Sequence, residues 1–96
     1  MVRYWYAYCY DSYGANYFRF IFQDERDLWI NTWKKVNIRI YPLANTEVER
    51  HLNNIPEARN IFEFDDELLN RFRANIKLIE SGKYKSAIEY LISDVK

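Results

Sequence analysis

Residues 2–23 constrain the fold of this chain more than any other segment. Two runs rich in aromatic residues, 2–10 and 17–23, lie on either side of a short break that contains Gly14. In both runs the residue types alternate with a period of two. Side chains alternate between the faces of a β-strand, and aromatic residues are enriched in strands, so the pattern predicts a β-hairpin.

The two faces of the predicted hairpin differ in composition. One face is apolar with small residues in its middle, as expected under a helix, and collects Trp5, Ala7, Cys9, Phe18, Phe20 and Phe22. The other, which we call the tyrosine face, is formed by Tyr4, Tyr6, Tyr8, Tyr10, Tyr17 and Arg19. A turn centred between Tyr13 and Gly14 pairs Cys9 with Phe18 and Trp5 with Phe22. A slip of one residue would mix the two faces, so the alternation disfavours it.

The segment after the hairpin predicts a helix and then a third strand. Asp24 is typical of an N-cap, and one helical stripe follows it: Leu28, Trp29, Thr32, Trp33 and Val36. Residues 37–41 alternate as a strand that ends at Pro42. Strand, helix and strand in this order form a β-α-β crossover, whose helix covers the apolar face. We expect the third strand to pair beside the first, which gives the order 2-1-3.

Residues 44–96 are predicted to be mainly helical. Thr46 and Glu49 form a capping-box pattern for a short helix over 47–54, and residues 61–64 fit either an edge strand or the lead-in to the next helix. Asp65 or Asp66 then caps the longest helix, whose apolar stripe comprises Leu68, Leu69, Phe72, Ile76 and Ile79. That helix ends at Gly82. Residues 83–95 predict a second helix, which completes an antiparallel αα-hairpin.

Residues 82–91, which read GKYKSAIEYL, resemble the junction inside a tetratricopeptide repeat. In that family the glycine turns the chain, while the tyrosine and alanine let two helices approach closely. The resemblance covers the inner part of one repeat, whereas stacked repeats need roughly three copies for stability. It therefore implies a closely packed pair of helices, and it does not extend to the family's peptide binding.

These patterns together predict a single α+β domain over residues 1–96. Its ββαβ part, 1–43, forms a sheet of three or four mainly antiparallel strands, and 44–96 is the helical part. The single cysteine excludes an internal disulfide framework and fits a reducing compartment. The chain has no apolar segment of the secretory type near residue 1 and no long apolar run. We therefore expect a cytoplasmic protein that does not enter a membrane.

Side chains that carry catalysis or bind metals are sparse in this sequence. His51 is the only histidine and Cys9 the only cysteine, so neither a hydrolase triad nor a zinc site can be assembled from them. An acidic cluster consists of Glu63, Asp65, Asp66 and Glu67. It lacks the spacing of a calcium-binding loop, and helix capping explains it. We expect no enzymatic activity, no cofactor and no metal site.

The tyrosine face is the strongest candidate for a functional surface. It is either covered by the C-terminal helices or open to a partner. Tyr and Arg are typical of protein interfaces, although aromatic sheets also stack the bases of single-stranded nucleic acids. The net charge is zero, with six Lys and Arg against four Asp and Glu in residues 1–43, and eight against ten in 44–96. This balance favours a protein partner over a phosphate backbone.

We therefore expect a non-catalytic protein that binds another macromolecule. The first expectation is a protein partner, with this chain as a small intracellular regulator or inhibitor. Single-stranded RNA or DNA is the alternative partner, and a homodimer is a further way to cover the tyrosine face. Stand-alone domains of this size and kind include phage-encoded and accessory proteins that block a host machine, which is an association at the level of class.

Overall fold

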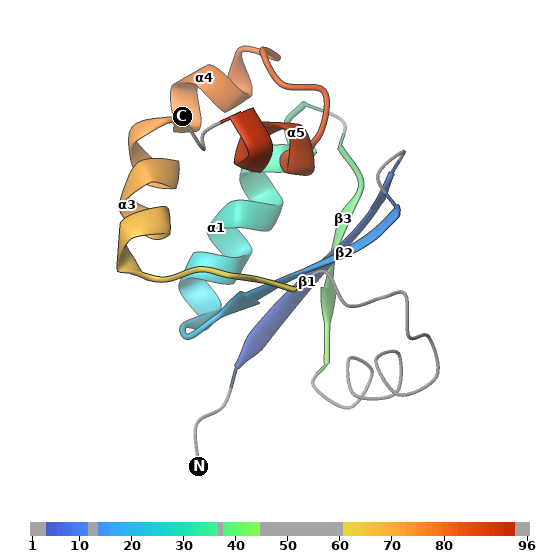
Figure 1. Cartoon of the computed structure of the whole chain (residues 1–96), viewed down its shortest axis with the longest axis vertical. Helices are drawn as coiled ribbons and strands as arrows, with labels where there is room; N and C mark the ends of the chain where they lie inside the picture. Colours follow the sequence, from blue (N-terminus) through green and yellow to red (C-terminus); the bar gives the residue numbers. More distant parts are fainter. Residues whose placement is uncertain (1–3, 12–13, 37, 45–60, 94–96) are drawn as a thin grey trace.

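The structure is a computed structural model that describes residues 4–11, 14–36, 38–44 and 61–93. Its strands are β1 (Trp5–Asp11), β2 (Gly14–Phe20), β3 (Ile40–Leu43) and β4 (Ile61–Glu63). Its helices are α1 (Gln23–Lys34), α3 (Asp66–Ala74), α4 (Ile76–Glu80) and α5 (Ala87–Ser93). Figure 1 shows these helices on one side of the sheet, as a second layer. The predicted α+β fold, with an N-terminal hairpin and C-terminal helices, is confirmed.

The four strands form one mixed sheet in the order β3-β1-β2-β4. β1 is antiparallel to both β2 and β3, so the expected order 2-1-3 is confirmed. Residues 61–63 form an edge strand, β4, which pairs in parallel with β2. The backbone N–H of Phe64 continues this pairing by donating to the carbonyl oxygen of Arg19 at 2.9 Å. The C-terminal half of the chain therefore contributes a strand to the sheet that the hairpin begins.

The hairpin has the predicted faces, but its register differs from the predicted one by two residues. Trp5 lies opposite Phe20, and Cys9 lies opposite Asn16. The last pair joins Asp11 to Gly14, so the turn precedes Gly14 instead of containing it. Gly14 does have a positive φ, of 94°. A shift of two residues keeps every side chain on its face, so the alternation that predicts the faces does not distinguish these two registers.

Helix α1 begins two residues earlier than expected from an Asp24 cap. Phe22 occupies the N-cap position without a side-chain hydrogen bond, and it is 64% exposed, so its predicted place opposite Trp5 is wrong. Asp24 instead lies in the first turn, where its negative charge favours the helix dipole. Leu28 is 36% exposed and Ile30 is buried. The buried stripe of α1 is thus rotated away from Leu28.

The core lies between the apolar face of the sheet and the layer of helices. Trp29 and Trp33 are fully buried, as predicted, and Trp29 packs on Phe18 with ring centroids 5.2 Å apart. Ala7 and Cys9 are small and buried in the middle of this face, which leaves room for the two indoles of α1. The C-terminal helices join the same core through a second set of buried side chains, Leu69, Phe72, Ile79, Ile88, Tyr90 and Leu91.

The helix expected after residue 64 is divided in two. Asp65 caps α3, because its Oδ1 accepts a hydrogen bond from the backbone N–H of Leu68 at 2.8 Å, which confirms the predicted cap. Asn75 then interrupts the helix with φ −107° and ψ 6°, and α4 follows. Gly82 has a positive φ of 83°, as expected of a residue that ends a helix. These two short helices together bury the stripe that was expected of one long helix.

The last helix and the third strand have boundaries other than the predicted ones. α5 begins at Ala87 and not at Lys83, because the hydroxyl of Ser86 accepts a hydrogen bond from the N–H of Glu89 at 2.9 Å and acts as the cap. Pro42 lies within β3 and does not end it, which an edge strand tolerates. The helix expected over 47–54, with His51, lies outside the described residues.

Candidate functional site

The tyrosine face lies on the side of the sheet opposite the helix layer. The register places Ile61, Tyr17, Tyr8 and Tyr41 in one row across the four strands. Glu63, Arg19, Tyr6 and Leu43 form the next row. All the described helices pack on the apolar face instead, so no described helix covers the tyrosine face (Figure 1). The first of the two expected arrangements, with the C-terminal helices over this face, is therefore not the one observed.

The tyrosine face has a buried middle and an exposed end. Tyr17 is only 1% exposed and packs against Tyr8, with ring centroids 5.2 Å apart. Tyr4, Tyr6 and Tyr8 are half-buried, whereas Tyr10 is 69% exposed. The side chain most open to a partner is therefore Tyr10, whereas Tyr17 is not accessible to one.

Arg19 is held by neighbours within the chain. Its guanidinium forms an ion pair with Glu63 of β4 and lies over the ring of Tyr4, 4.4 Å from the ring centroid. The positive charge that the sequence placed in the middle of the tyrosine face is therefore compensated. Arg19 ties β2 to β4 and orients Tyr4, so its charge is less available to an outside partner.

Sequence reasoning missed Tyr41, which belongs to the same surface. It lies opposite Tyr8 in the β1–β3 pairing and is 48% exposed. The signal was present in the strand pattern. Ile38 and Ile40 alternate toward the core, so Tyr41 must point to the other face. Tyr10 and Tyr41 together form the exposed end of the tyrosine face.

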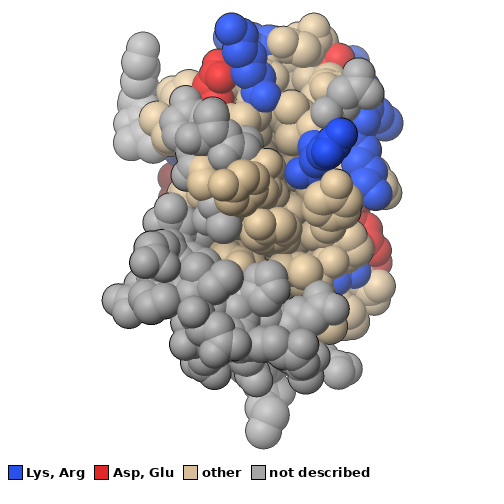
Figure 2. Space-filling view, turned by 90° about the vertical axis from the view of Figure 1, so that its right-hand side faces the viewer, with Lys and Arg blue, Asp and Glu red and all other residues tan. Residues whose placement is uncertain are grey.

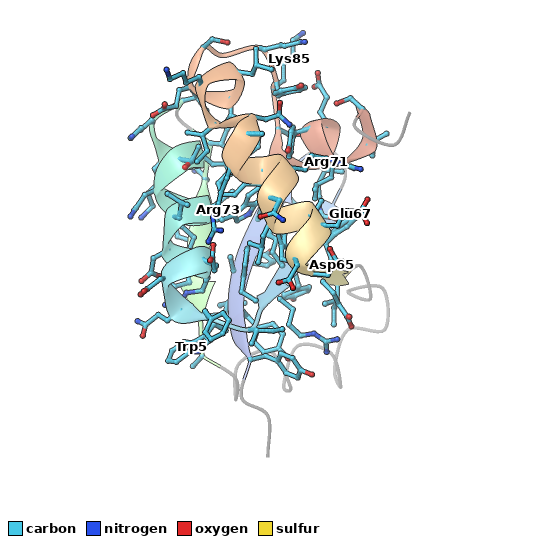
Figure 3. All side chains as sticks on the ribbon, turned by 90° about the vertical axis from the view of Figure 1, so that its left-hand side faces the viewer. Trp5, Asp65, Glu67, Arg71, Arg73 and Lys85 are labelled. Atoms are coloured by element: carbon cyan, nitrogen blue, oxygen red, sulfur yellow. The ribbon has the colours of Figure 1, made fainter. Side chains whose placement is uncertain are left out.

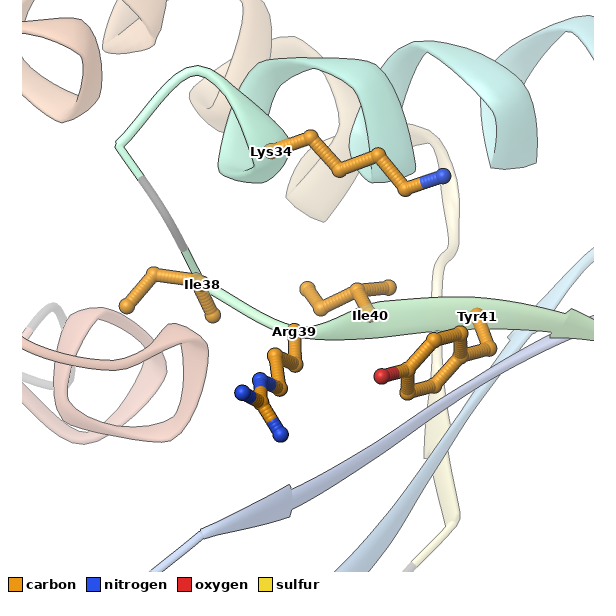
Figure 4. A pocket seen from close by; sticks show the side chains of 5 residues that line it. All are labelled: Lys34, Ile38, Arg39, Ile40 and Tyr41. Carbon is orange, nitrogen blue, oxygen red and sulfur yellow. The ribbon is translucent and has the colours of Figure 1, made fainter.

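A hollow of about 390 Å³ adjoins this exposed end at the outer edge of β3. Its lining combines the end of α1 with β3 and consists of Lys34, Ile38, Arg39, Ile40 and Tyr41. Figure 4 shows Arg39 and Tyr41 on one side of β3 and Lys34 on the other, with the Lys34 side chain extended along α1. A space-filling view of this side of the molecule shows basic side chains near its upper part (Figure 2).

The other candidate residues have structural roles. Of the acidic cluster, Asp65 caps α3, Glu63 pairs with Arg19, and Glu67 lies 3.5 Å from Arg71 one turn along the helix (Figure 3). Cys9 is buried in the core. Within the described ranges, no group of three or more His, Cys, Asp or Glu side chains could hold a metal ion.

Comparison with known proteins finds no match among family models, curated sequences or solved structures. In the part of the chain that the structure describes, every helix is too short or too polar to cross a bilayer. What the protein does must therefore be argued from its own surface.

The buried middle of the tyrosine face should make the protein sensitive to alkaline pH. Burial raises the pKa of Tyr8 above 10.0, with smaller contributions from Tyr10 and Cys9. Burial and then Tyr8 raise the pKa of Tyr17. Above about pH 10 the unfolded state loses these phenol protons, whereas the folded state keeps them. The contribution of Tyr8 and Tyr17 to the free energy of unfolding is therefore complete below about pH 10 and declines as the pH rises further.

Urea unfolding at a series of alkaline pH values measures this decline. A variant with both Tyr8→Phe and Tyr17→Phe should lose less stability per pH unit above about pH 10 than the wild-type protein does. If the free energy of unfolding declines equally with pH in the two proteins, burial does not raise the pKa values of Tyr8 and Tyr17 in the folded state.

Proposed function

We propose that this protein binds another protein through the exposed end of its tyrosine face and acts as a small non-catalytic regulator or inhibitor. One observation carries the proposal. The described helices all pack on the apolar face, while the opposite face presents two large exposed phenols, Tyr10 and Tyr41. Large amphipathic rings without a packing role in the core are typical of protein-binding surfaces.

The chemistry of this surface supports a protein partner. A tyrosine offers a large, stiff contact area with a polar tip, so it loses little conformational entropy when it is buried in an interface. Tyr10 and Tyr41 lie on a β-sheet, which holds both rings in place before the partner arrives. This rigidity lowers the entropic cost of association.

Single-stranded nucleic acid remains the second candidate, because aromatic rings on a sheet can stack bases. The charge pattern speaks against it. A bound strand would run its phosphates past the middle of the face, where the charge of Arg19 is compensated by Glu63. The chain as a whole has no net charge either. A phosphate backbone needs a track of cations, and a protein interface does not.

Site-specific photo-crosslinking in the native host tests the proposal. A benzoylphenylalanine at position 10 or 41 should capture a protein that mass spectrometry identifies. The same probe at position 92 is the control, because Ile92 is 55% exposed but lies on α5, in the helix layer. Capture of RNA or DNA at positions 10 and 41, or identical products at all three positions, would contradict a protein partner at this face.

Binding measurements with the captured partner then show how much each exposed tyrosine contributes to the affinity. Tyr10→Ala and Tyr41→Ala should each weaken binding by about 2 kcal/mol, as loss of a central interface side chain does. Both changes should leave the melting temperature nearly unchanged, because both rings are exposed. Ile92→Ala should leave the affinity unchanged. An affinity that is the same for all three variants would place the interface elsewhere.

A further inference from the structure

Tyr17 is buried on a face of the sheet that no described helix covers. Its ring belongs to the tyrosine face, yet it is only 1% exposed in the single chain. Its neighbours in the same row, Tyr8 on β1 and Ile61 on β4, are only half-buried. Side chains in one row of a sheet shield each other from the side, and they leave open the end of a ring that points away from the sheet. Another part of the same chain must therefore lie over Tyr17.

β3 and β4 are parallel strands at opposite edges of the sheet. The order is β3-β1-β2-β4, β1 is antiparallel to both β2 and β3, and β4 is parallel to β2. From the end of β3 at Leu43 to the start of β4 at Ile61, the chain must pass β1 and β2 and also return along the length of the strands. Parallel strands need such a crossover connection. The crossover runs over one face of the sheet or the other.

Handedness selects the tyrosine face for this crossover. The connection from β2 through α1 to β3 also joins parallel strands, and α1 packs on the apolar face with the other described helices (Figure 1). It leads toward the β3 edge of the sheet, whereas the connection from β3 to β4 leads in the opposite direction. Two crossovers in opposite directions over the same face have opposite hands, and about 98% of such connections are right-handed. The two connections are therefore expected on opposite faces.

The connecting segment, residues 45–60, is long enough for this path and has apolar residues to bury. When extended it can span about 50 Å, whereas three strand spacings amount to about 14 Å. Its sequence places Val48, Leu52 and Ile55 at the spacing of one helix face. An apolar stripe of this kind needs a surface that excludes water, and the aromatic rings of the tyrosine face provide one.

We infer that residues 45–60 cross the tyrosine face and cover its middle, with Tyr17 beneath them. The burial of Tyr17 and the order of the strands support this independently of each other. Tyr10 and Tyr41 remain exposed, so the surface that the proposed function uses is unaffected. The covered middle is closed to the bases of a single strand, which confines a partner on this face to its exposed end.

Nuclear Overhauser effects in the full, unsubstituted chain test the inference. In protein with labelled methyl groups and tyrosine rings, the ring protons of Tyr17 should give cross-peaks to the methyl groups of Val48, Leu52 or Ile55. A mixture of labelled and unlabelled protein separates contacts within one chain from contacts between two copies. Cross-peaks to these methyl groups that arise only between copies would overturn the inference in favour of a dimer. Cross-peaks from Tyr17 that are confined to residues outside 45–60 would also overturn it.

Nitration of tyrosines by tetranitromethane gives a second readout. Tyr10 is 69% exposed and should react in every variant, whereas Tyr17 should be protected in the wild-type protein. Leu52→Asp should raise the nitration rate of Tyr17 toward that of Tyr10. Ile92→Asp is the matched control, because it adds the same charge at an exposed position of α5 and should leave Tyr17 protected.

Tyr90 shows whether the fold of the variant is intact, because its ring is fully buried in the core. Unchanged protection of Tyr17 in a Leu52→Asp protein that still protects Tyr90 would overturn the inference. Nitration of Tyr90 as well would report unfolding, and the cross-peaks of the wild-type protein then decide.

Discussion

Replacement of Trp29 by alanine is expected to lower the free energy of unfolding by about 3–5 kcal/mol, the range for removal of a large core ring. Trp29 is fully buried. Its ring lies 4.7 Å from Phe64, 4.9 Å from Phe72 and 5.4 Å from Trp33, measured between centroids. It therefore joins α1 to the end of β4 and to α3. Urea unfolding followed by circular dichroism measures the effect.

Leu28→Ala is the matched control for this experiment. Leu28 precedes Trp29 on α1, but it is 36% exposed, so the change should cost only about 1 kcal/mol. Native tryptophan fluorescence adds a second measurement. Trp29 and Trp33 are buried, so the emission should shift to the red on unfolding. Similar costs for Trp29→Ala and Leu28→Ala would contradict the packing of α1 described here.

Ile88→Asp on α5 is expected to destabilise the fold by about 3–5 kcal/mol, the cost of an unpaired charge in the interior. Ile88 is 3% exposed and belongs to the core cluster, where the buried neighbours are apolar. A carboxylate there would lose its hydration without gaining a cationic partner. Thermal and urea unfolding of the purified variant measure the loss, and a large fraction of unfolded protein at room temperature would also satisfy the prediction.

The same substitution one turn later provides the control. Ile92 lies on the same helix and is 55% exposed, so Ile92→Asp should change the free energy of unfolding by about 0.5 kcal/mol or less. The two variants have the same composition and net charge. Equal stability of Ile88→Asp and Ile92→Asp would show that α5 does not pack into the core. The C-terminal helices would then be available to cover the tyrosine face, and the proposed binding surface would lose its main support.

The position of the C-terminal helices matters for the proposed function because it gives the two faces of the sheet different roles. One face carries the core, and the other carries the exposed tyrosines. Tyr90 of α5 packs against Trp33 of α1, with ring centroids 6.0 Å apart, so α5 and α1 share one core. With this core complete on the apolar side, the exposed rings Tyr10 and Tyr41 have no described packing role. The proposed interface depends on that division.

Local periodicity was sufficient to predict the hairpin, helix α1, strand β3 and which hairpin residues share a face, but not the division of the C-terminal helices. The alternation in residues 2–23 separates the Trp5 face from the Tyr8 face, and both assignments hold in the structure. It was not sufficient for the register. Pairing Cys9 with Phe18 or with Asn16 keeps the same faces, and only packing against α1 and closure of the turn distinguish them. The predicted starts of two helices were wrong for a similar reason. Phe22 and Ser86 occupy the N-cap positions, and several nearby residues could have filled them.

The sequence by itself determined an α+β chain with an apolar sheet face, a tyrosine face and helices whose stripes require burial. The tertiary structure alone decided where those helices pack, that β4 joins β2, and that Glu63 neutralises Arg19. It also brought Tyr41 beside Tyr8. The physical reason is the distance along the sequence over which each kind of interaction acts. Alternation and capping are properties of neighbouring residues, whereas contacts between distant segments depend on how all the apolar surfaces are buried together.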